Sequence, residues 1–212
     1  MYRHFFKRIF DLFLALIALP FWLIILIIIG PIIYFQDKGP IFYNASRLGK
    51  NGKIFKMYKF RSMKINAPDI RNEDGSTYNS EYDPRLTKIG KFIRKTSIDE
   101  TPQLLNIIKG DMSIIGPRPD LPEHRILYKG NEERKLEIRP GITGYSQAYY
   151  RNTLPWKERI QNDIIYIDNL SLVFDIKIFF KTVITVLKRK DIYVIHENAE
   201  NEVVANKYID LV

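Results

Sequence analysis

The sequence contains no cysteine and only three histidines among its 212 residues. The lack of cysteine excludes a disulfide framework, a thiolate zinc site and a cysteine nucleophile. The histidines (His4, His124 and His196) are scattered, so no zinc cluster is visible. The sequence also has no Gly-x-x-x-x-Gly-Lys loop and no Gly-x-Gly-x-x-Gly fingerprint. A nucleotide, if one binds, is therefore not held by a familiar nucleotide-binding loop.

Acidic residues are nearly missing from the first part of the chain. Residues 1–64 contain only Asp11 and Asp37, against 11 lysines and arginines, and so carry the whole net charge of +9. The remaining 148 residues contain equal numbers of basic and acidic side chains. The excess charge flanks one hydrophobic segment, which is typical of a protein on a phospholipid membrane surface. It does not fit a nucleic-acid binder, whose basic residues spread over a groove.

The hydrophobic segment covers residues 12–35, which include no charged side chain. A helix of this length measures about 36 Å, enough to cross a bilayer core of about 30 Å. Basic residues stand on both sides of it, although positive charge marks the cytoplasmic side. Pro20 also interrupts it, which leaves a first arm of about 12 Å. Two topologies stay open: a re-entrant helix that returns to the same face, and a spanning helix with a tolerated proline.

The rest of the sequence predicts an α+β fold, mainly helical with a small β-hairpin. Asn51-Gly52 lies between two short apolar-polar runs and predicts the hairpin. Residues 65–84 are polar and rich in turn formers, which indicates a long loop. We expect a membrane helix over 1–38, a second domain with interfacial helices over 39–190 and a peripheral tail over 191–212. Helical patterns cover 86–94, 98–109, 156–169 and 172–190, and the apolar face of the last helix could pack in a core or lie on a bilayer.

Two adjacent carboxylates, Asp99 and Glu100, stand where the predicted helix over 98–109 begins. In one interpretation, Ser97 and Glu100 form a capping box and the acids serve the helix alone. In the other, Asp99 is a nucleophile and Glu100 a neighbouring base. A helix N-terminus suits this second role because its free N–H groups and partial positive charge also hold a phosphate.

Several arginines have no close acidic neighbour in the sequence, and some are held in turns by proline and glycine. The guanidinium group matches phosphate oxygens in two-point contacts, so these side chains are candidates for binding an anionic substrate. The alternative is that they are surface residues paired with nearby acids. The set comprises Arg61, Arg94, Arg118, Arg139 and Arg151.

Together these motifs resemble the small monotopic phosphoglycosyl transferases, a family of bacterial sugar transferases. The resemblance covers residues 1–190. It is carried by KFRSM at 59–63, SIDETPQLLNIIKGDMSIIGPRP at 97–119, RPGITGYSQ at 139–147 and the spacing of Asp163, Tyr166, Ser171 and Asp175.

The resemblance implies an enzyme on the cytoplasmic face of the bacterial inner membrane, with residues 39–190 as its cytoplasmic catalytic domain. The family transfers a sugar 1-phosphate from a UDP-sugar to polyprenol (undecaprenyl) phosphate, releases UMP and uses Mg²⁺, as the first membrane step of glycan assembly. It specifies neither the sugar nor the oligomeric state. The alternative function is a membrane-anchored scaffold that binds acidic ligands without chemistry.

The resemblance also implies roles for single residues. Asp99 matches the nucleophile, which forms a covalent phosphosugar intermediate and contacts the metal, and Glu100 matches the acid that prepares polyprenol phosphate. Pro20 matches the break in the re-entrant helix. The substrate-binding positions are Lys59, Arg61, Arg94, Arg118, Arg139, Gln147 and Arg151.

The sequence departs from the family pattern at a few positions. Leu19 replaces a common serine before the helix-breaking proline. A serine hydroxyl can bond a backbone group that the bend frees, whereas leucine cannot, so we expect the angle of the re-entrant helix to differ from the family's. The segment Ala148-Tyr149-Tyr150 replaces a frequent Val-Asn-Gly beside Arg151, which we expect to affect the choice of sugar.

Overall fold

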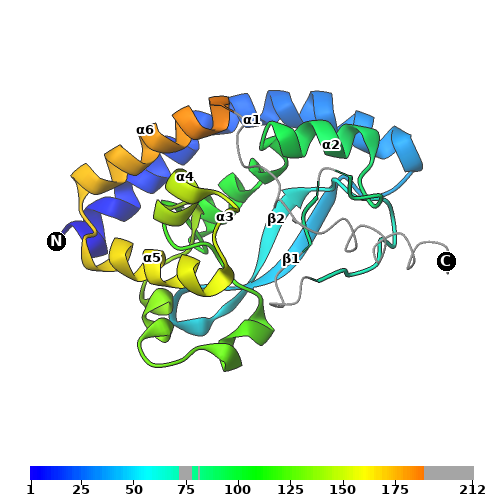
Figure 1. The fold of residues 1–212 in the computed structure, drawn as a ribbon. Coiled ribbons are helices and arrows are strands. Elements are labelled where there is room, and N and C mark those ends of the chain that lie inside the picture. Colours follow the sequence, from blue (N-terminus) through cyan, green and yellow to red (C-terminus); the bar gives the residue numbers. More distant parts are fainter. Residues whose placement is uncertain (72–77, 81, 189–212) are drawn as a thin grey trace.

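A computed structural model describes residues 1–71, 78–80 and 82–188 (Figure 1). A short π-helical turn, η1 (Tyr2–Phe6), leads directly into the long apolar helix α1 (Lys7–Asp37). Both Pro20 and Pro31 lie inside α1, which stays helical through them and arches over one side of the molecule. Pro20 therefore does not break α1. Within the described ranges, α1 is the one helix long and apolar enough to cross a membrane.

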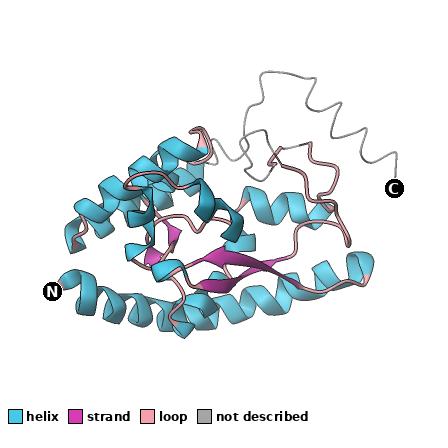
Figure 2. Cartoon of the chain, turned by 90° about the horizontal axis from the view of Figure 1, so that it is seen from below, coloured by secondary structure: helices cyan, strands magenta, loops and turns pink. Residues whose placement is uncertain are grey.

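Both halves of α1 pack against the same body of the protein. Ala15 and Trp22 of the first part join a buried cluster with Phe55, while Ile29 and Ile33 of the second part pack with Ile93. Figure 2 shows α1 running along the whole length of the molecule beside the hairpin. One stripe of α1 is thus buried against protein from end to end, and its remaining surface is exposed and apolar.

The predicted hairpin is confirmed. Strands β1 (Phe42–Leu48) and β2 (Ile54–Phe60) pair antiparallel around the 3-10 turn η2 (Lys50–Gly52). Asn51 and Gly52 both have positive φ there, a backbone conformation that asparagine and glycine tolerate best. Strand β2 of the hairpin carries Lys59, one of the residues of the candidate site.

Helices α2 (Lys88–Lys95) and α3 (Gln103–Lys109) pack beside the hairpin. The amide of Asn106 replaces a third strand: its Oδ1 accepts from the Tyr58 N–H at 2.9 Å, and its Nδ2 donates to the Lys56 carbonyl at 2.7 Å. These bonds satisfy the outer edge of β2 and fix α3 against it. The position of the Asp99–Glu100 segment, which lies between α2 and α3, follows from this attachment.

The prediction of one helix over 98–109 is wrong at its beginning. Residues Ile98–Glu100 form a separate 3-10 turn, η3, and α3 begins only at Gln103. The predicted end at Gly110 is confirmed, because Gly110 adopts the left-handed conformation that closes the helix.

A small parallel sheet joins two motifs that are distant in the sequence. Strand β3 (Ser113–Ile115) pairs with β4 (Gly141–Thr143), and both are followed by glycine. A Cβ atom on Gly144 would lie 2.1 Å from the Gly116 carbonyl oxygen, so only glycine allows this approach. The contact holds the turn of residues 116–119 against the start of α4. The chain between the strands forms the 3-10 helices η4 (Pro122–Leu127) and η5 (Glu132–Glu137).

Helices α4 (Tyr145–Tyr150), α5 (Trp156–Asp168) and α6 (Leu172–Lys188) complete the fold. The last two match the predictions over 156–169 and 172–190, although residues 189 and 190 lie outside the described residues. The apolar face of α6 is exposed rather than in the core: Phe180 is 62% exposed and Leu187 75%. The apolar face of α6 is therefore not part of a core, and its contact with a bilayer stays a prediction.

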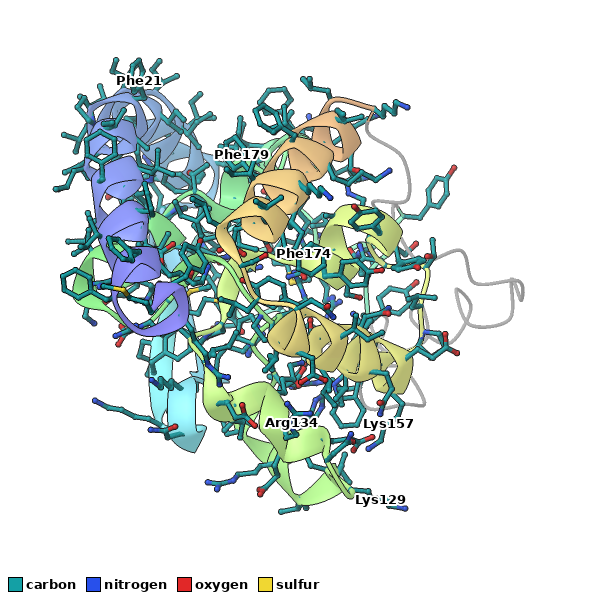
Figure 3. All side chains as sticks on the ribbon, turned by 90° about the vertical axis from the view of Figure 1, so that its left-hand side faces the viewer. Phe21, Lys129, Arg134, Lys157, Phe174 and Phe179 are labelled. Atoms are coloured by element: carbon teal, nitrogen blue, oxygen red, sulfur yellow. The ribbon has the colours of Figure 1, made fainter. Side chains whose placement is uncertain are left out.

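Most of the exposed large apolar residues lie on α1 and α6. Helices α1, α2 and α6 lie along the same side, uppermost in Figure 1. In Figure 3, Phe21 and Phe179 lie toward this side, and Lys129, Arg134 and Lys157 lie at the opposite end. The α+β class with a long apolar helix at the N-terminus is confirmed. The domain boundaries near 38 and 190 stay predictions, and the expected tail over 191–212 lies outside the described residues.

Candidate active site

The Asp99–Glu100 turn is not capped by Ser97. Ser97 adopts a left-handed backbone conformation (φ 59°) and its side chain makes no capping hydrogen bond. The capping-box interpretation is therefore wrong, and the two carboxylates do not lie at an α-helix N-terminus as expected. Asp99 is 8% exposed. A buried carboxylate and a positive φ at a serine are both costly, and such costs are typical of functional positions.

Glu100 is held by positive charge from two other elements. The Lys59 ammonium of β2 donates to Glu100 Oε1 at 2.6 Å, and the Arg118 guanidinium lies 3.8 Å from the same oxygen. Arg118 belongs to the turn that the glycine contact at 116 and 144 holds in place. Three separate segments thus meet at this pair of carboxylates.

The two neighbouring carboxylates differ in their proton affinity. Burial raises the pKa of Asp99, the Glu100 charge adds to this effect, and the nearby cations oppose it only in part. Burial also acts on Glu100, but Lys59 and Arg118 outweigh it and lower the pKa of that carboxyl. Glu100 is therefore firmly ionised, while Asp99 is a poorly solvated carboxylate without an ion-pair partner among the described residues. Poor solvation makes a carboxylate more nucleophilic.

Arg94 approaches the pair from the last turn of α2. Its Nε donates to Ser62 Oγ at 2.9 Å, and its charge acts on both Asp99 and Glu100. Helix α2 reaches this position because Gly90 packs directly on the Ser62 carbonyl, which a Cβ atom would approach to 1.8 Å. The predicted residues Lys59, Arg94 and Arg118 are thus brought together around Asp99 and Glu100. Ser62 was missed by the sequence reasoning, although it lies within the quoted KFRSM motif.

Two other predicted arginines are occupied by protein acceptors. Arg61 forms a two-point ion pair with Asp37 at 2.5 and 2.6 Å, and its Nε donates to the Pro40 carbonyl. Arg139 donates through Nε to the Gly110 carbonyl at 2.8 Å. These bonds tie down the ends of α1 and α3, so the geometry does not favour the expected substrate contacts.

The remaining predicted residues lie on or just after α4. Both amide atoms of Gln147 are buried without a hydrogen-bond partner among the described residues. A buried amide in this state is poised to bind a ligand group. Arg151 ends α4 with an unusual backbone conformation (φ 48°, ψ −113°). Pro20 lies near the middle of α1 on its exposed side, while Leu19 packs partly against the core cluster of Ala15 and Trp22.

Comparison with known proteins adds independent information. The family model described as bacterial sugar transferase matches residues 2–189. The galactosyl transferase CpsE of Streptococcus agalactiae is 42% identical over 85% of this chain. The uncharacterized sugar transferase EpsL of Bacillus subtilis is 41% identical over 85% of it. The undecaprenyl-phosphate galactose phosphotransferase of Salmonella typhimurium is 38% identical over 89% of it.

The relatives differ in length. The chain spans 87% of the Bacillus protein but only 42% of the Streptococcus and Salmonella proteins.

Proposed function

Because the chain belongs to the bacterial sugar transferase family, it is a transferase, and we propose that it transfers a sugar 1-phosphate from a UDP-sugar to polyprenol phosphate. The observation that carries this proposal is the buried Asp99 beside the ion-paired Glu100, surrounded by Lys59, Arg94 and Arg118. Both substrates are anionic, and these three cations offset the repulsion between them. The related Salmonella protein is named for a transfer of the same kind.

In the first step, an Asp99 carboxylate oxygen attacks the phosphorus that carries the sugar. A bond forms between that oxygen and phosphorus, and the bond from phosphorus to the bridging oxygen of the diphosphate breaks. UMP leaves with the bridging oxygen and its electron pair, and Asp99 carries the phosphosugar. Asp99 suits this step because burial leaves its carboxylate poorly solvated. Arg118 and Lys59 are placed to stabilise charge on the transferring group.

In the second step, an oxygen of polyprenol phosphate attacks the same phosphorus and the Asp99 carboxylate leaves. The product is the polyprenyl diphosphosugar. The Lys59 contact keeps Glu100 ionised and therefore a weak proton acceptor. When the acceptor phosphate binds, Lys59 moves to it, and Glu100 then takes up the proton of the monoanionic acceptor. Two successive displacements replace one direct attack between anions.

Magnesium fits this donor set. Mg²⁺ in proteins often takes one or two carboxylates and completes its shell with water and substrate phosphates. In the described part of the chain no group of three or more metal-binding side chains occurs, but the Asp99 carboxylate next to a bound diphosphate suffices. Bound there, the metal would neutralise phosphate charge during the transfer.

The proposal places the enzyme on the cytoplasmic face of the inner membrane with α1 re-entrant. Several observations support this topology. Both halves of α1 pack on the same protein body, whereas a spanning helix has a half that only lipid contacts. The exposed apolar faces of α1 and α6 lie along one side of the molecule. The ion pair between Asp37, the last residue of α1, and Arg61 fixes the C-terminal end of α1 beside the hairpin.

Single-cysteine labelling tests this topology, since the sequence has no cysteine of its own. We expect Phe5→Cys and Lys53→Cys to react with a membrane-impermeant maleimide only when the cytoplasmic face is accessible. Phe21→Cys is expected to stay unlabelled in membranes and to react after detergent extraction. Labelling of Phe5→Cys and Lys53→Cys from opposite faces would establish a spanning helix.

Turnover tests the function. The purified protein, mixed with a panel of UDP-sugars, polyprenol phosphate and Mg²⁺, is expected to release UMP with at least one donor. Without acceptor, intact-protein mass spectrometry is expected to show the added mass of one phosphosugar. No UMP from any donor would return the scaffold alternative to consideration, and UMP release without an adduct would reject the covalent step.

A further inference from the structure

Arg47 lies on the hairpin face that also carries Lys59. In the strand register Tyr43 pairs with Lys59 and Arg47 with Phe55, and residues that pair or alternate along a strand share one face. Lys56, by contrast, pairs with Ser46 on the opposite face and donates to its Oγ at 2.9 Å. Arg47 therefore faces the side of the hairpin on which the Lys59–Glu100 pair lies.

The charge of Arg47 is not neutralised by a carboxylate of the described residues. Its Nη1 donates to the Ser46 carbonyl at 2.8 Å, and it takes part in none of the ion pairs there. Burial and the charges of Arg118 and Arg71 lower the pKa of its guanidinium. A half-buried arginine beside other arginines is costly for the free protein and favours an anionic ligand.

Asp120, whose negative charge acts on Arg47, is already bound by other side chains. Asp120 Oδ2 accepts from Lys135 at 2.6 Å and from Tyr128 at 2.8 Å, and its Oδ1 accepts from Trp156 at 3.0 Å. Arg71 has its own partners, Asp69 at 2.6 Å and Glu123 at 3.7 Å. Among the described residues, Arg47 is thus a cation without a carboxylate partner, and it lies beside the half-exposed Arg118, which shares Glu100 with Lys59.

The backbone holds Arg47 beside the Arg118 turn. The Leu48 N–H donates to the Asp120 carbonyl at 2.9 Å, which joins the end of β1 to residues 117–120. Arg118 in turn lies 3.8 Å from Glu100. Arg118 therefore lies between the two carboxylates and Arg47, and the two arginines form one positively charged surface.

The positions of Arg118 and Arg47 relative to the apolar side of the molecule indicate which ligand they bind. The start of β1 packs near the second half of α1 through Phe42, while its end at Leu48 lies away from α1, toward η4 and η5 (Figure 1). A lipid phosphate approaches from the apolar side formed by α1, α2 and α6. A water-soluble anion that extends from Asp99 away from this side reaches Arg118 first and then Arg47.

We propose that Arg47, together with Arg118, binds the nucleotide-side phosphate of the donor diphosphate and so holds the UMP leaving group. This inference rests on the proposed function. Arg47 has a fork of donors that matches phosphate oxygens, and the tight attachment of β1 fixes its position before the substrate binds. Charge that develops on the departing phosphate is stabilised at the end of the site remote from the lipid.

Steady-state kinetics of Arg47→Gln test the inference. We expect the KM for the UDP-sugar to rise by about 10- to 50-fold and product inhibition by UMP to weaken by a similar factor. The KM for polyprenol phosphate is expected to stay within about twofold. Arg47→Lys keeps the charge but loses the fork, so its effect is expected to be intermediate.

Lys56→Gln is the matched control, because it removes one positive charge from the opposite face of the same hairpin. Its KM values are expected to equal those of the wild type. Equal effects of the two variants would show a general electrostatic influence and overturn the inference. A rise in KM for polyprenol phosphate alone would assign Arg47 to the acceptor, which also overturns it.

Calorimetric binding of UMP separates this inference from the proposed function. The measurement needs no turnover, and Arg47→Gln is expected to weaken UMP binding at least about tenfold relative to Lys56→Gln. If the wild type turns over and UMP binds both variants equally, the inference fails and the function stands. If no donor turns over, the function fails, and weaker UMP binding by Arg47→Gln still supports a nucleotide phosphate at Arg47.

Discussion

Replacing Asp99 by asparagine is expected to lower sugar-phosphate transfer by at least about 10³-fold and to abolish the covalent adduct. The amide is nearly isosteric with the carboxylate but lacks the nucleophilic oxygen. Lys59 and Glu100 keep their ion pair, so the cationic surroundings of the site stay in place. UMP release and intact-protein mass spectrometry measure the two effects. Transfer near the wild-type rate would remove Asp99 from the nucleophile role.

The matched control is Asp168→Asn, which removes one carboxylate at the charged end of the molecule, where Asp168 pairs with Arg134. We expect it to leave transfer unchanged. A comparable loss of activity in this variant would show that removing one negative charge anywhere, rather than removing a nucleophile, causes the effect.

Asp99→Asn is also expected to be more stable than the wild type at neutral pH. Burial raises the pKa of Asp99 to about 6, whereas an unfolded aspartate has a pKa of about 3.9. A raised folded pKa disfavours the folded state once the group is ionised, so this contribution to stability is lost as pH rises through 6. Without metal, we expect Asp99→Asn to be about 1–2 kcal/mol more stable than the wild type at pH 7, with a higher midpoint of thermal unfolding. At about pH 3, below both pKa values, the two midpoints are expected to be equal. A variant less stable at pH 7 would contradict this account.

Asp175→Asn is expected to produce the largest loss of stability, about 3 kcal/mol. Asp175 is buried at the start of α6 and accepts from Lys7 at 2.7 Å, from Tyr2 at 2.6 Å and from Tyr166 at 2.7 Å. Asparagine keeps an oxygen for Tyr166 but replaces Oδ2, the oxygen that Tyr2 and Lys7 share, with an amide group. It thereby removes the one ion-pair partner that the buried Lys7 ammonium has among the described residues. Thermal unfolding in detergent measures the change.

The double variant Lys7→Met, Asp175→Asn tests the cause. Removing the ammonium as well eliminates the unpaired buried charge, so we expect it to regain about 2 kcal/mol of the loss. An additive loss would show that the tyrosine hydrogen bonds, not the ion pair, carry the stability. The position matters because Lys7 begins α1 and Asp175 lies in α6, so this pair joins two helices with exposed apolar faces.

Local patterns of the sequence predicted several elements well. Asn51-Gly52 determined the hairpin turn because its backbone needs positive φ. Gly110 ended α3 for the same reason, and the apolar periodicity of 172–190 predicted α6 with its apolar face. What these signals share is that the cause lies within a few residues of the effect.

The candidate site depended on contacts between distant segments. The sequence singled out Asp99 and Glu100, but it left the capping interpretation open, and the backbone of Ser97 decided against it. The sequence treated Arg61 and Arg118 alike, yet the fold pairs Arg61 with Asp37 and leaves Arg118 beside Glu100. A guanidinium has the same chemistry in both places, so only its neighbours distinguish an anchor from a ligand-binding group.

By itself, the sequence determined the chemistry available to this protein: adjacent carboxylates, arginines in rigid turns and one long apolar helix flanked by positive charge. The tertiary structure decided which of these groups meet. Close packing of glycine backbones at Gly90, Gly116 and Gly144 sets the distances between α2, the 116–119 turn and α4. Such distances depend on the whole folded chain, because each contact joins residues that are far apart in sequence and is fixed only when all the segments have packed.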